Sequence, residues 1–183
     1  MARVYMVRHG RAAAGWDTDP DPGLDDLGRH QAELMADTLA PIGPMRLISS
    51  PFRRCRETAA ILGSRWEVSA GIEPLVAEIP SPEGVPMGQR IEWLRGSMSG
   101  SWTALGLRYT EFRDGVSRYV SSLTEDTVIT SHFVAINAAI GAATGSDAVV
   151  IRSLGNCSVT VFDVVDGVVT LIEGGHEADT LIR

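Results

Sequence analysis

Three short, mostly apolar runs of the chain end abruptly in polar residues. They cover residues 4–7, 45–48 and 127–130. Their length and their content of Val, Ile and Leu are typical of buried strands. Arg8-His9 follows the first run, residues 49–54 follow the second, and Ser131-His132 follows the third. Because open α/β sheets bind ligands beyond the carboxyl ends of their strands, we expect these polar residues to share one site.

Two helices are predicted between these runs. Asp25 is a suitable N-cap for a helix that continues to about residue 39. One face of this helix is predicted to carry four residues: Leu27, Leu34, Met35 and Thr38. A second helix begins near Arg54 and is predicted to end at Gly63, because glycine commonly stands just past a helix C-terminus. A further strand, the third in chain order, is expected at residues 66–69.

The second half of the chain predicts a lid, two helices and a hairpin. Glycine and proline interrupt the pattern at residues 78–107, and this segment is expected to cover the sheet edge as a short lid. Amphipathic spacing over residues 112–123 predicts one helix, and the small residues from Val134 to about Ala143 predict another, which Gly145 ends. Finally, residues 159–163 and 168–172 form a hairpin pattern around Asp166-Gly167.

These elements predict the α/β class. The expected architecture is a three-layer α/β/α sandwich with a mostly parallel mixed sheet, a short lid insertion and an antiparallel end. At 183 residues and 44% hydrophobic content, with mean hydropathy +0.06, the chain can bury the core of a single domain over residues 1–183. The pattern does not indicate the oligomeric state.

Composition excludes several function classes. No stretch approaches the roughly 20 apolar residues of a membrane helix and no signal-peptide pattern occurs, so we expect a cytoplasmic protein without a membrane partner. A net charge of -7 argues against nucleic acid and favours a small-molecule partner. All 16 cationic side chains are arginines, which excludes a Schiff-base lysine and a Walker-type lysine. The cysteines, Cys55 and Cys157, are expected in the core.

The polar residues at the strand ends suit phosphoryl transfer. His9 is the candidate nucleophile, because neighbouring arginines disfavour the imidazolium and leave the ring neutral. Arg8 and Arg54 are candidate phosphate ligands through bidentate hydrogen bonds. His132, at the start of a helix, is a further donor to the phosphoryl group. Glu78 is the candidate general acid, provided that burial under the lid raises its pKa.

Two assignments have alternatives. Glu83, five residues beyond Glu78, is the reserve candidate for the general acid. Arg11 lies just past His9, where it either contacts the distal group of the substrate or lies on the loop surface.

Five motifs, in order along nearly the whole chain, resemble the histidine phosphatase superfamily, in the branch that includes cofactor-dependent phosphoglycerate mutase. They are R-H-G at 8–10, L-D-x-L-G-x-x-Q-A at 24–32, S-P-F-R-R-C-x-x-T-A at 50–59, L-x-x-E at 75–78 and V-x-x-S-H at 128–132. Phe133 departs from the family's common His-Gly-Gly and places a phenyl ring beside the phosphate. Asn137 stands where many relatives have an arginine, which removes one possible substrate cation.

The resemblance implies a metal-independent phosphomonoesterase that forms a phosphohistidine on His9, uses no cofactor and acts on a small phosphorylated metabolite. A phosphoglycerate mutase-type phosphotransferase and a catalytically weak phosphate-binding regulatory module are the alternatives. A metal hydrolase that uses His9, His132 and a carboxylate is a further rival, but no motif such as HExxH is present.

Overall fold

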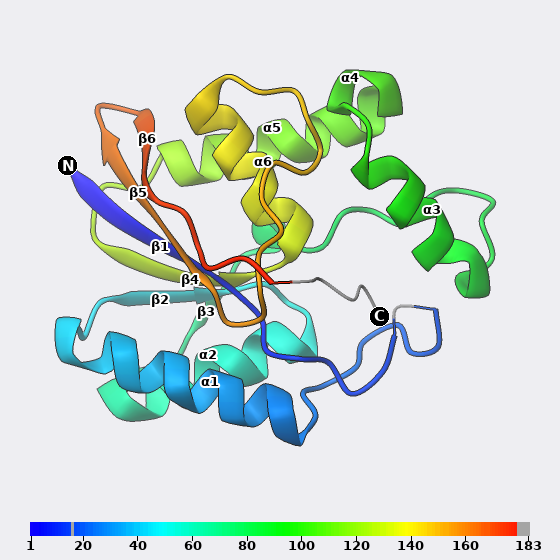
Figure 1. Cartoon of the computed structure of the whole chain (residues 1–183). Coiled ribbons are helices and arrows are strands. Elements are labelled where there is room, and N and C mark those ends of the chain that lie inside the picture. Colours follow the sequence, from blue (N-terminus) through cyan, green and yellow to red (C-terminus); the bar gives the residue numbers. More distant parts are fainter. Residues whose placement is uncertain (16, 179–183) are drawn as a thin grey trace.

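A mixed sheet organises the chain in the computed structural model, which describes residues 1–15 and 17–178. Within these residues the sheet has six strands in the order β3-β2-β4-β1-β5-β6 (Figure 1). The strands are β1 (Ala2–Arg8), β2 (Arg46–Ser49), β3 (Gly71–Ile72), β4 (Thr127–Ser131), β5 (Val159–Val165) and β6 (Val168–Glu173). The first four are parallel, whereas β5 and β6 pair antiparallel. The prediction of a mostly parallel mixed sheet is confirmed.

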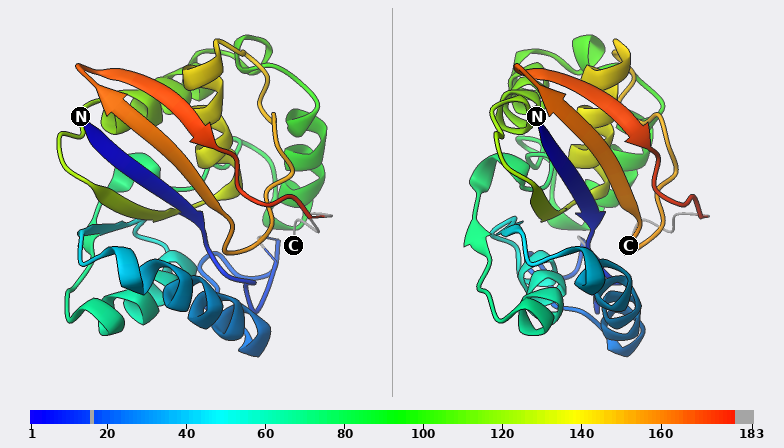
Figure 2. Two further views of the ribbon diagram at one scale, coloured as in Figure 1. Left: turned by 60° about the vertical axis from the view of Figure 1, so that its left-hand side comes forward. Right: turned by 90° about the vertical axis from the view of Figure 1, so that its left-hand side faces the viewer.

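Helices cover both faces of the sheet. On one face lie α1 (Asp26–Leu39) and α2 (Arg53–Trp66), and on the other lie α5 (Leu107–Ser121) and α6 (Phe133–Thr144) (Figure 2). Two hydrophobic clusters fill the two interfaces, one around Met35 and Leu62 and the other around Ile136 and Phe162. The three-layer α/β/α prediction is therefore confirmed. Short 3-10 helices add η1 (Ala40–Ile42), η2 (Pro74–Val76) and η3 (Met87–Gln89).

The predicted packing face of α1 is largely wrong. Leu27 and Leu34 are exposed, and the buried residues are Gly28, Ala32, Met35, Ala36 and Leu39. Small residues dominate this set because the helix backbone closely approaches the loop after β1, where a Cβ on Gly28 would collide with Arg11. The N-cap is correct, since the Asp25 side chain accepts a hydrogen bond from the N–H of Gly28.

The predicted end of α2 is also wrong. The helix continues past Gly63 to Trp66, and Glu67 takes the left-handed conformation at φ 57°. Gly63 lies inside the helix, where the chain after α2 passes too close for a side chain. A Cβ on Gly63 would lie 2.6 Å from the backbone oxygen of Val68. The third strand is consequently displaced from residues 66–69 to β3.

The segment at 78–107 is more ordered than its glycines and prolines predict. It contains α3 (Arg90–Met98) and α4 (Trp102–Leu105). Ile79, Leu94 and Trp102 are buried in the core shared with α5 and α6. Trp102 packs against Phe112 with ring centroids 5.8 Å apart. This segment is therefore part of the domain body as well as the candidate lid.

Other predicted elements are confirmed. Gly145 ends α6 in the left-handed conformation at φ 69°. Asp166 and Gly167 have φ values of 50° and 81° in the turn between β5 and β6, as a type I′ hairpin requires. Both cysteines are buried.

Candidate active site

The register of the parallel strands brings the predicted site residues to one sheet edge. Arg8 pairs with Ser131 across β1 and β4, and Ser49 pairs with Thr130 across β2 and β4. The alignment continues just past the end of β1, where the N–H of His9 donates to Ser131 O at 3.0 Å. The rings of His9 and His132 consequently lie 5.3 Å apart between centroids.

The proton of His9 is held on the nitrogen that points away from the site. Its Nδ1 lies 2.7 Å from the carbonyl oxygen of Gly10, which can only accept a hydrogen bond. Nε2 therefore carries the lone pair and accepts from Nε of Arg54 at 3.1 Å. Burial, reinforced by the charge of Arg54, lowers the pKa of His9 well below its usual value. This lowered pKa agrees with the expectation of a neutral imidazole.

Two motifs hold the loop that carries His9. The N–H of Gly10 donates to the hydroxyl of Thr58 on α2. The N–H of Arg11 donates to the side-chain oxygen of Gln31 on α1 at 2.9 Å. A Cβ on Gly10 would collide with the backbone of Gly28, so the loop and α1 require glycine on both sides. The spacing of these motifs along the chain thus has a structural cause.

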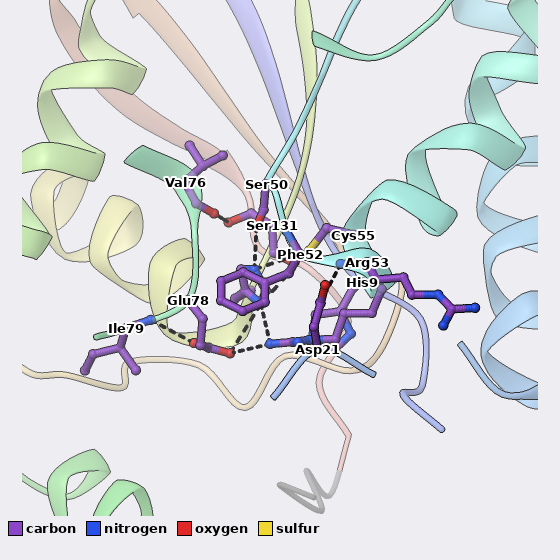
Figure 3. A network of polar contacts seen from close by, with 12 residues as sticks. His9, Asp21, Ser50, Phe52, Arg53, Cys55, Val76, Glu78, Ile79 and Ser131 are labelled. Atoms are coloured by element: carbon purple, nitrogen blue, oxygen red, sulfur yellow. Dashed lines mark hydrogen bonds and ion pairs between the residues drawn. The ribbon is translucent and has the colours of Figure 1, made fainter. Parts of the chain in front are cut away.

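Arg54 lies between the two histidines. Besides its contact with His9, its Nη2 lies 3.1 Å from Nδ1 of His132 and 3.3 Å from Oε2 of Glu78. Figure 3 shows the carboxylate of Glu78 within this network of polar contacts. The side chain is buried, and no described residue accepts a hydrogen bond from its Nη1. The ring of Phe52 packs against the guanidinium at 5.0 Å. Arg54 can therefore offer donors to an anion that displaces its present partners.

Arg8, the residue before His9 at the end of β1, is also buried. Its Nη1 donates to the carbonyl oxygen of Leu154 at 2.6 Å. Burial lowers the pKa of Arg8 to about 10, so the guanidinium stays charged near neutral pH. The phenyl ring of Phe133, which replaces a family glycine, lies 5.2 Å from the guanidinium carbon. This ring supports Arg8 through a cation–π contact.

His132 is fully buried at the N-cap of α6. Its Nε2 lies 2.7 Å from the hydroxyl of Ser50, and its Nδ1 lies 3.2 Å from Oε2 of Glu78. Burial lowers the pKa of His132, although the nearby carboxylate of Glu78 partly opposes this effect. Both ring nitrogens are therefore engaged by side chains of the site.

Glu78 follows η2 and reaches the same cluster. Burial raises the pKa of its carboxyl group. The contacts with His132, Arg54 and the N–H of Ile79 lower this pKa by more than burial raises it, to about 2. The condition set for a general acid, a pKa raised by burial, is therefore not met in the ligand-free protein, because the contacts with His132, Arg54 and the backbone donor outweigh desolvation. Glu83 is exposed and pairs with Arg108, whereas Glu78 contacts the site.

Two further residues are held by other partners. Nε of Arg11 lies 2.5 Å from the carboxylate of Asp25, and the side chain is partly exposed. Asn137 is buried, where its amide oxygen accepts the N–H groups of Ile151 and Arg152 and its amide nitrogen donates to Phe133 O. Asn137 therefore holds the loop after α6.

Sequence reasoning missed the loop at residues 152–158. Leu154 contributes a carbonyl oxygen to Arg8, and the side chain of Asn156 donates to the carbonyl oxygen of His9 at 3.0 Å. Ser50 was matched to a motif without a role. A backbone carbonyl leaves no signal in a sequence. Ser50, in contrast, is a buried polar residue directly after β2, and the strand-end argument that found His9 and His132 could have found it. Asn156 is only partly buried and lies in a loop that carries no such signal.

Within residues 1–15 and 17–178, no group of three or more His, Cys, Asp or Glu side chains has the arrangement of a metal site. The same described residues contain no helix that is both long and apolar enough to span a membrane.

Comparisons with known proteins agree with this geometry. The model of the histidine phosphatase superfamily (branch 1) matches residues 4–174. Glucosyl-3-phosphoglycerate phosphatase of Mycolicibacterium vanbaalenii is 40% identical over 80 residues, which are 42% of this chain and 36% of that protein. A probable phosphoglycerate mutase of Photorhabdus laumondii is 32% identical over 83 residues, which are 43% of this chain and 39% of that protein. The matches thus span less than two fifths of these curated relatives.

Solved structures share the fold over most of the chain. Bacillus stearothermophilus YhfR superposes with a TM-score of 0.77 at 18% identity, covering 93% of this chain and 95% of that one. A mycobacterial glucosyl-3-phosphoglycerate phosphatase in complex with VO3 has a TM-score of 0.67 at 24% identity, covering 89% and 93% of the two chains. With the family model matching almost from end to end, the chain belongs to the histidine phosphatase superfamily (branch 1).

Proposed function

We propose that this protein is a metal-independent phosphomonoesterase that transfers the phosphoryl group of a small phosphorylated metabolite to His9 and then to water. The observation that carries this proposal is the tautomer of His9, whose Nε2 lone pair faces the guanidinium of Arg54. A neutral imidazole in this position is a nucleophile directed at a phosphate-binding cation.

The phosphoryl dianion would replace His9 and Glu78 as the partner of Arg54. Nη1 of Arg54 supplies a donor that no described residue uses, and Arg8 supplies a second guanidinium. His132, whose ring lies 5.3 Å from that of His9, contributes the ring nitrogen that now contacts Nη2 of Arg54. Positive charge around the equatorial oxygens stabilises the charge of the transition state, which is the main demand of phosphoryl transfer.

Glu78 would act as the general acid and then as the general base. A bound dianion removes Arg54 from Glu78 and adds negative charge beside the carboxylate, and both effects raise its pKa. In the first half-reaction the P–N bond to His9 forms, the P–O bond to the leaving group breaks, and Glu78 protonates the leaving oxygen. In the second, Glu78 takes a proton from water, the water oxygen bonds to phosphorus and the P–N bond breaks, which releases inorganic phosphate and restores neutral His9.

Family membership supports this proposal, as does the similarity to a glucosyl-3-phosphoglycerate phosphatase and to a probable phosphatase of Schizosaccharomyces pombe. The cytoplasmic location, the lack of nucleic-acid and membrane partners and the contact of Arg11 with substrate remain predictions.

The test is phosphate release from p-nitrophenyl phosphate. We expect hydrolysis that vanadate inhibits, that chelators leave unchanged, and that His9→Ala abolishes. Vanadate adopts the trigonal-bipyramidal geometry that the two imidazoles and two guanidiniums would stabilise. Activity that disappears with EDTA and returns with zinc would instead support the metal-hydrolase rival. Full activity in His9→Ala would reject the nucleophile.

A further inference from the structure

We infer that the site selects phosphate esters of uncharged, hydroxyl-bearing alcohols over phosphorylated carboxylic acids, and that Asp21 determines this selectivity. This inference rests on the proposed function and adds the substrate class. It concerns the rim of the site, where the part of the substrate beyond its phosphoryl group must lie.

The arginines next to the phosphate ligands are already neutralised. Arg11, which follows the His9-Gly10 loop, is paired with Asp25 at 2.5 Å. Arg53, adjacent to Arg54, is paired with Glu57 at 2.8 Å, and the same carboxylate lies 3.5 Å from Arg29. A substrate carboxylate would have to compete with these existing partners. The rim therefore offers no ready site for a second anion near these arginines.

The interior of the site also lacks spare positive charge. Arg8 and Arg54 contribute two cations, and the lowered pKa values of His9 and His132 leave both rings neutral. Glu78, once protonated as the general acid, adds no charge to the substrate-bound site. Two positive charges thus face a phosphoryl group that carries two negative charges, and no cation is left for a third. A further negative charge on the leaving group would be repelled once the phosphoryl group is bound.

Asp21 adds a negative charge at the rim. Its Oδ1 accepts the N–H of Arg53 at 2.7 Å, which places the carboxylate beside the backbone that joins Phe52 to Arg54 (Figure 3). No arginine or histidine forms an ion pair with Asp21 among the residues that the structure describes. A carboxylate in this setting repels a substrate carboxylate, whereas its second oxygen can accept a hydrogen bond from a substrate hydroxyl.

Phe52 complements this preference. Its partly exposed ring contacts the ring of His132, with centroids 5.3 Å apart, and also the guanidinium of Arg54. The ring presents an apolar surface next to the phosphate ligands. Such a surface suits the carbon skeleton of a polyol or sugar, whose hydroxyls then reach the adjacent acceptor.

A matched pair of substrates tests the inference. Glycerol 3-phosphate carries a hydroxymethyl group where 3-phosphoglycerate carries a carboxylate, and the two are otherwise alike. We expect kcat/KM for glycerol 3-phosphate to exceed that for 3-phosphoglycerate by about tenfold, because the substrate carboxylate and Asp21 form a like-charge pair near the protein surface. Equal values, or a preference for 3-phosphoglycerate, would overturn the inference.

The variant Asp21→Asn tests the residue. Its amide oxygen can still accept the N–H of Arg53, so the start of α2 keeps its partner while the charge is lost. We expect the ratio of the two kcat/KM values to fall about fivefold, mainly because 3-phosphoglycerate is hydrolysed faster. Asp166→Asn, in the β5–β6 turn at the opposite edge of the sheet, is the control and should keep the wild-type ratio. An unchanged ratio in Asp21→Asn would reject Asp21 as the determinant.

Hydrolysis of p-nitrophenyl phosphate distinguishes a failure of the substrate inference from a failure of the proposed function. Its leaving group has no carboxylate, so His9-dependent hydrolysis of this ester tests the proposed function alone. If that activity is present while 3-phosphoglycerate is preferred, the substrate inference fails and the proposed function stands. If it is absent, the proposed function fails and the substrate inference fails with it.

Discussion

Nδ1 of His9 lies 2.7 Å from the carbonyl oxygen of Gly10, and this single contact determines which nitrogen of the ring can react. A carbonyl oxygen accepts but cannot donate, so the proton resides on Nδ1 and the lone pair on Nε2. The acceptor belongs to the next residue of the chain, which ties the tautomer to the backbone of the Arg8-His9-Gly10 loop. Contacts that hold this loop therefore affect the chemistry as well as the fold.

The first prediction concerns stability below neutral pH. The folded-state pKa of His9 is depressed, so its contribution to stability is complete above the unfolded value of about 6.5 and is lost as pH falls, because only the unfolded chain takes up the proton. At about pH 5.5, this one imidazole should lower the free energy of unfolding by about 1.4 kcal/mol. Urea unfolding of wild type and His9→Gln at about pH 7.5 and 5.5 measures the difference.

The loss between the two pH values should be smaller in His9→Gln by that amount. His30→Gln removes an exposed imidazole on α1 and is the matched control, in which the wild-type loss should persist. An identical pH dependence in wild type and His9→Gln would show that His9 is not held neutral by the fold.

The second prediction concerns the geometry of Arg54. Its Nε and Nη2 contact the two histidines simultaneously, which a lysine ammonium cannot do. We expect Arg54→Lys to lower kcat/KM by at least about 100-fold, the size of effect seen when one preorganised oxyanion donor is removed, and to weaken vanadate inhibition. Arg53→Lys changes the exposed neighbour on the same helix turn and should stay within about twofold of wild type. Comparable losses in the two variants would contradict the assigned role.

The third prediction concerns the close approach of the His9 loop to α1. A Cβ on Gly10 would meet backbone atoms of Gly28, which cannot move aside as a flexible side chain would. Gly10→Ala should therefore destabilise the protein by about 1–3 kcal/mol, as overpacking does, and lower activity. Gly96→Ala lies in open space on α3 and should be neutral or stabilising by up to about 1 kcal/mol. Denaturant unfolding of both variants distinguishes these effects, and a stable, fully active Gly10→Ala protein would contradict the account.

The fourth prediction assigns the general acid. Replacing the carboxyl of Glu78 by an amide removes proton transfer, which is worth about 10²–10⁴ in rate when the leaving group is a poor one. Glu78→Gln should slow hydrolysis of an alkyl phosphate far more than that of p-nitrophenyl phosphate, because a nitrophenolate leaves without protonation. Glu83→Gln should leave both rates within about twofold. An equal loss on both esters would move the acid role away from Glu78.

The strand ends of the site could be predicted from the sequence because two independent signals agree there. The apolar runs before Arg8 and before Ser131 indicate buried strands. Polar residues directly after such strands lie at the edge of the sheet where α/β proteins bind ligands. The adjacency of His9 and His132 follows from parallel pairing, which places residues at matching strand ends side by side.

Predictions failed where close packing overrode a local rule. Gly63 satisfies the statistics of a helix end, yet it lies inside α2 because the backbone of Val68 passes too near for a side chain. Leu27 and Leu34 follow helical spacing but are exposed, because α1 packs through its small residues. The low pKa of Glu78 depends on contacts with His132 and Arg54, which no local pattern encodes.

The most direct test of the account is the site and chemistry of the phosphoenzyme. Rapid quenching during turnover of a ³²P-labelled phosphomonoester should trap one phosphoryl group that is labile in acid and stable in base, as a phosphoramidate is, and peptide mapping should place it on Nε2 of His9. His9→Ala should trap none, whereas His132→Ala should retain some label. A label of equal intensity in His9→Ala, or one carried by Nδ1 of His9 or by an oxygen or sulfur atom, would contradict the central claim.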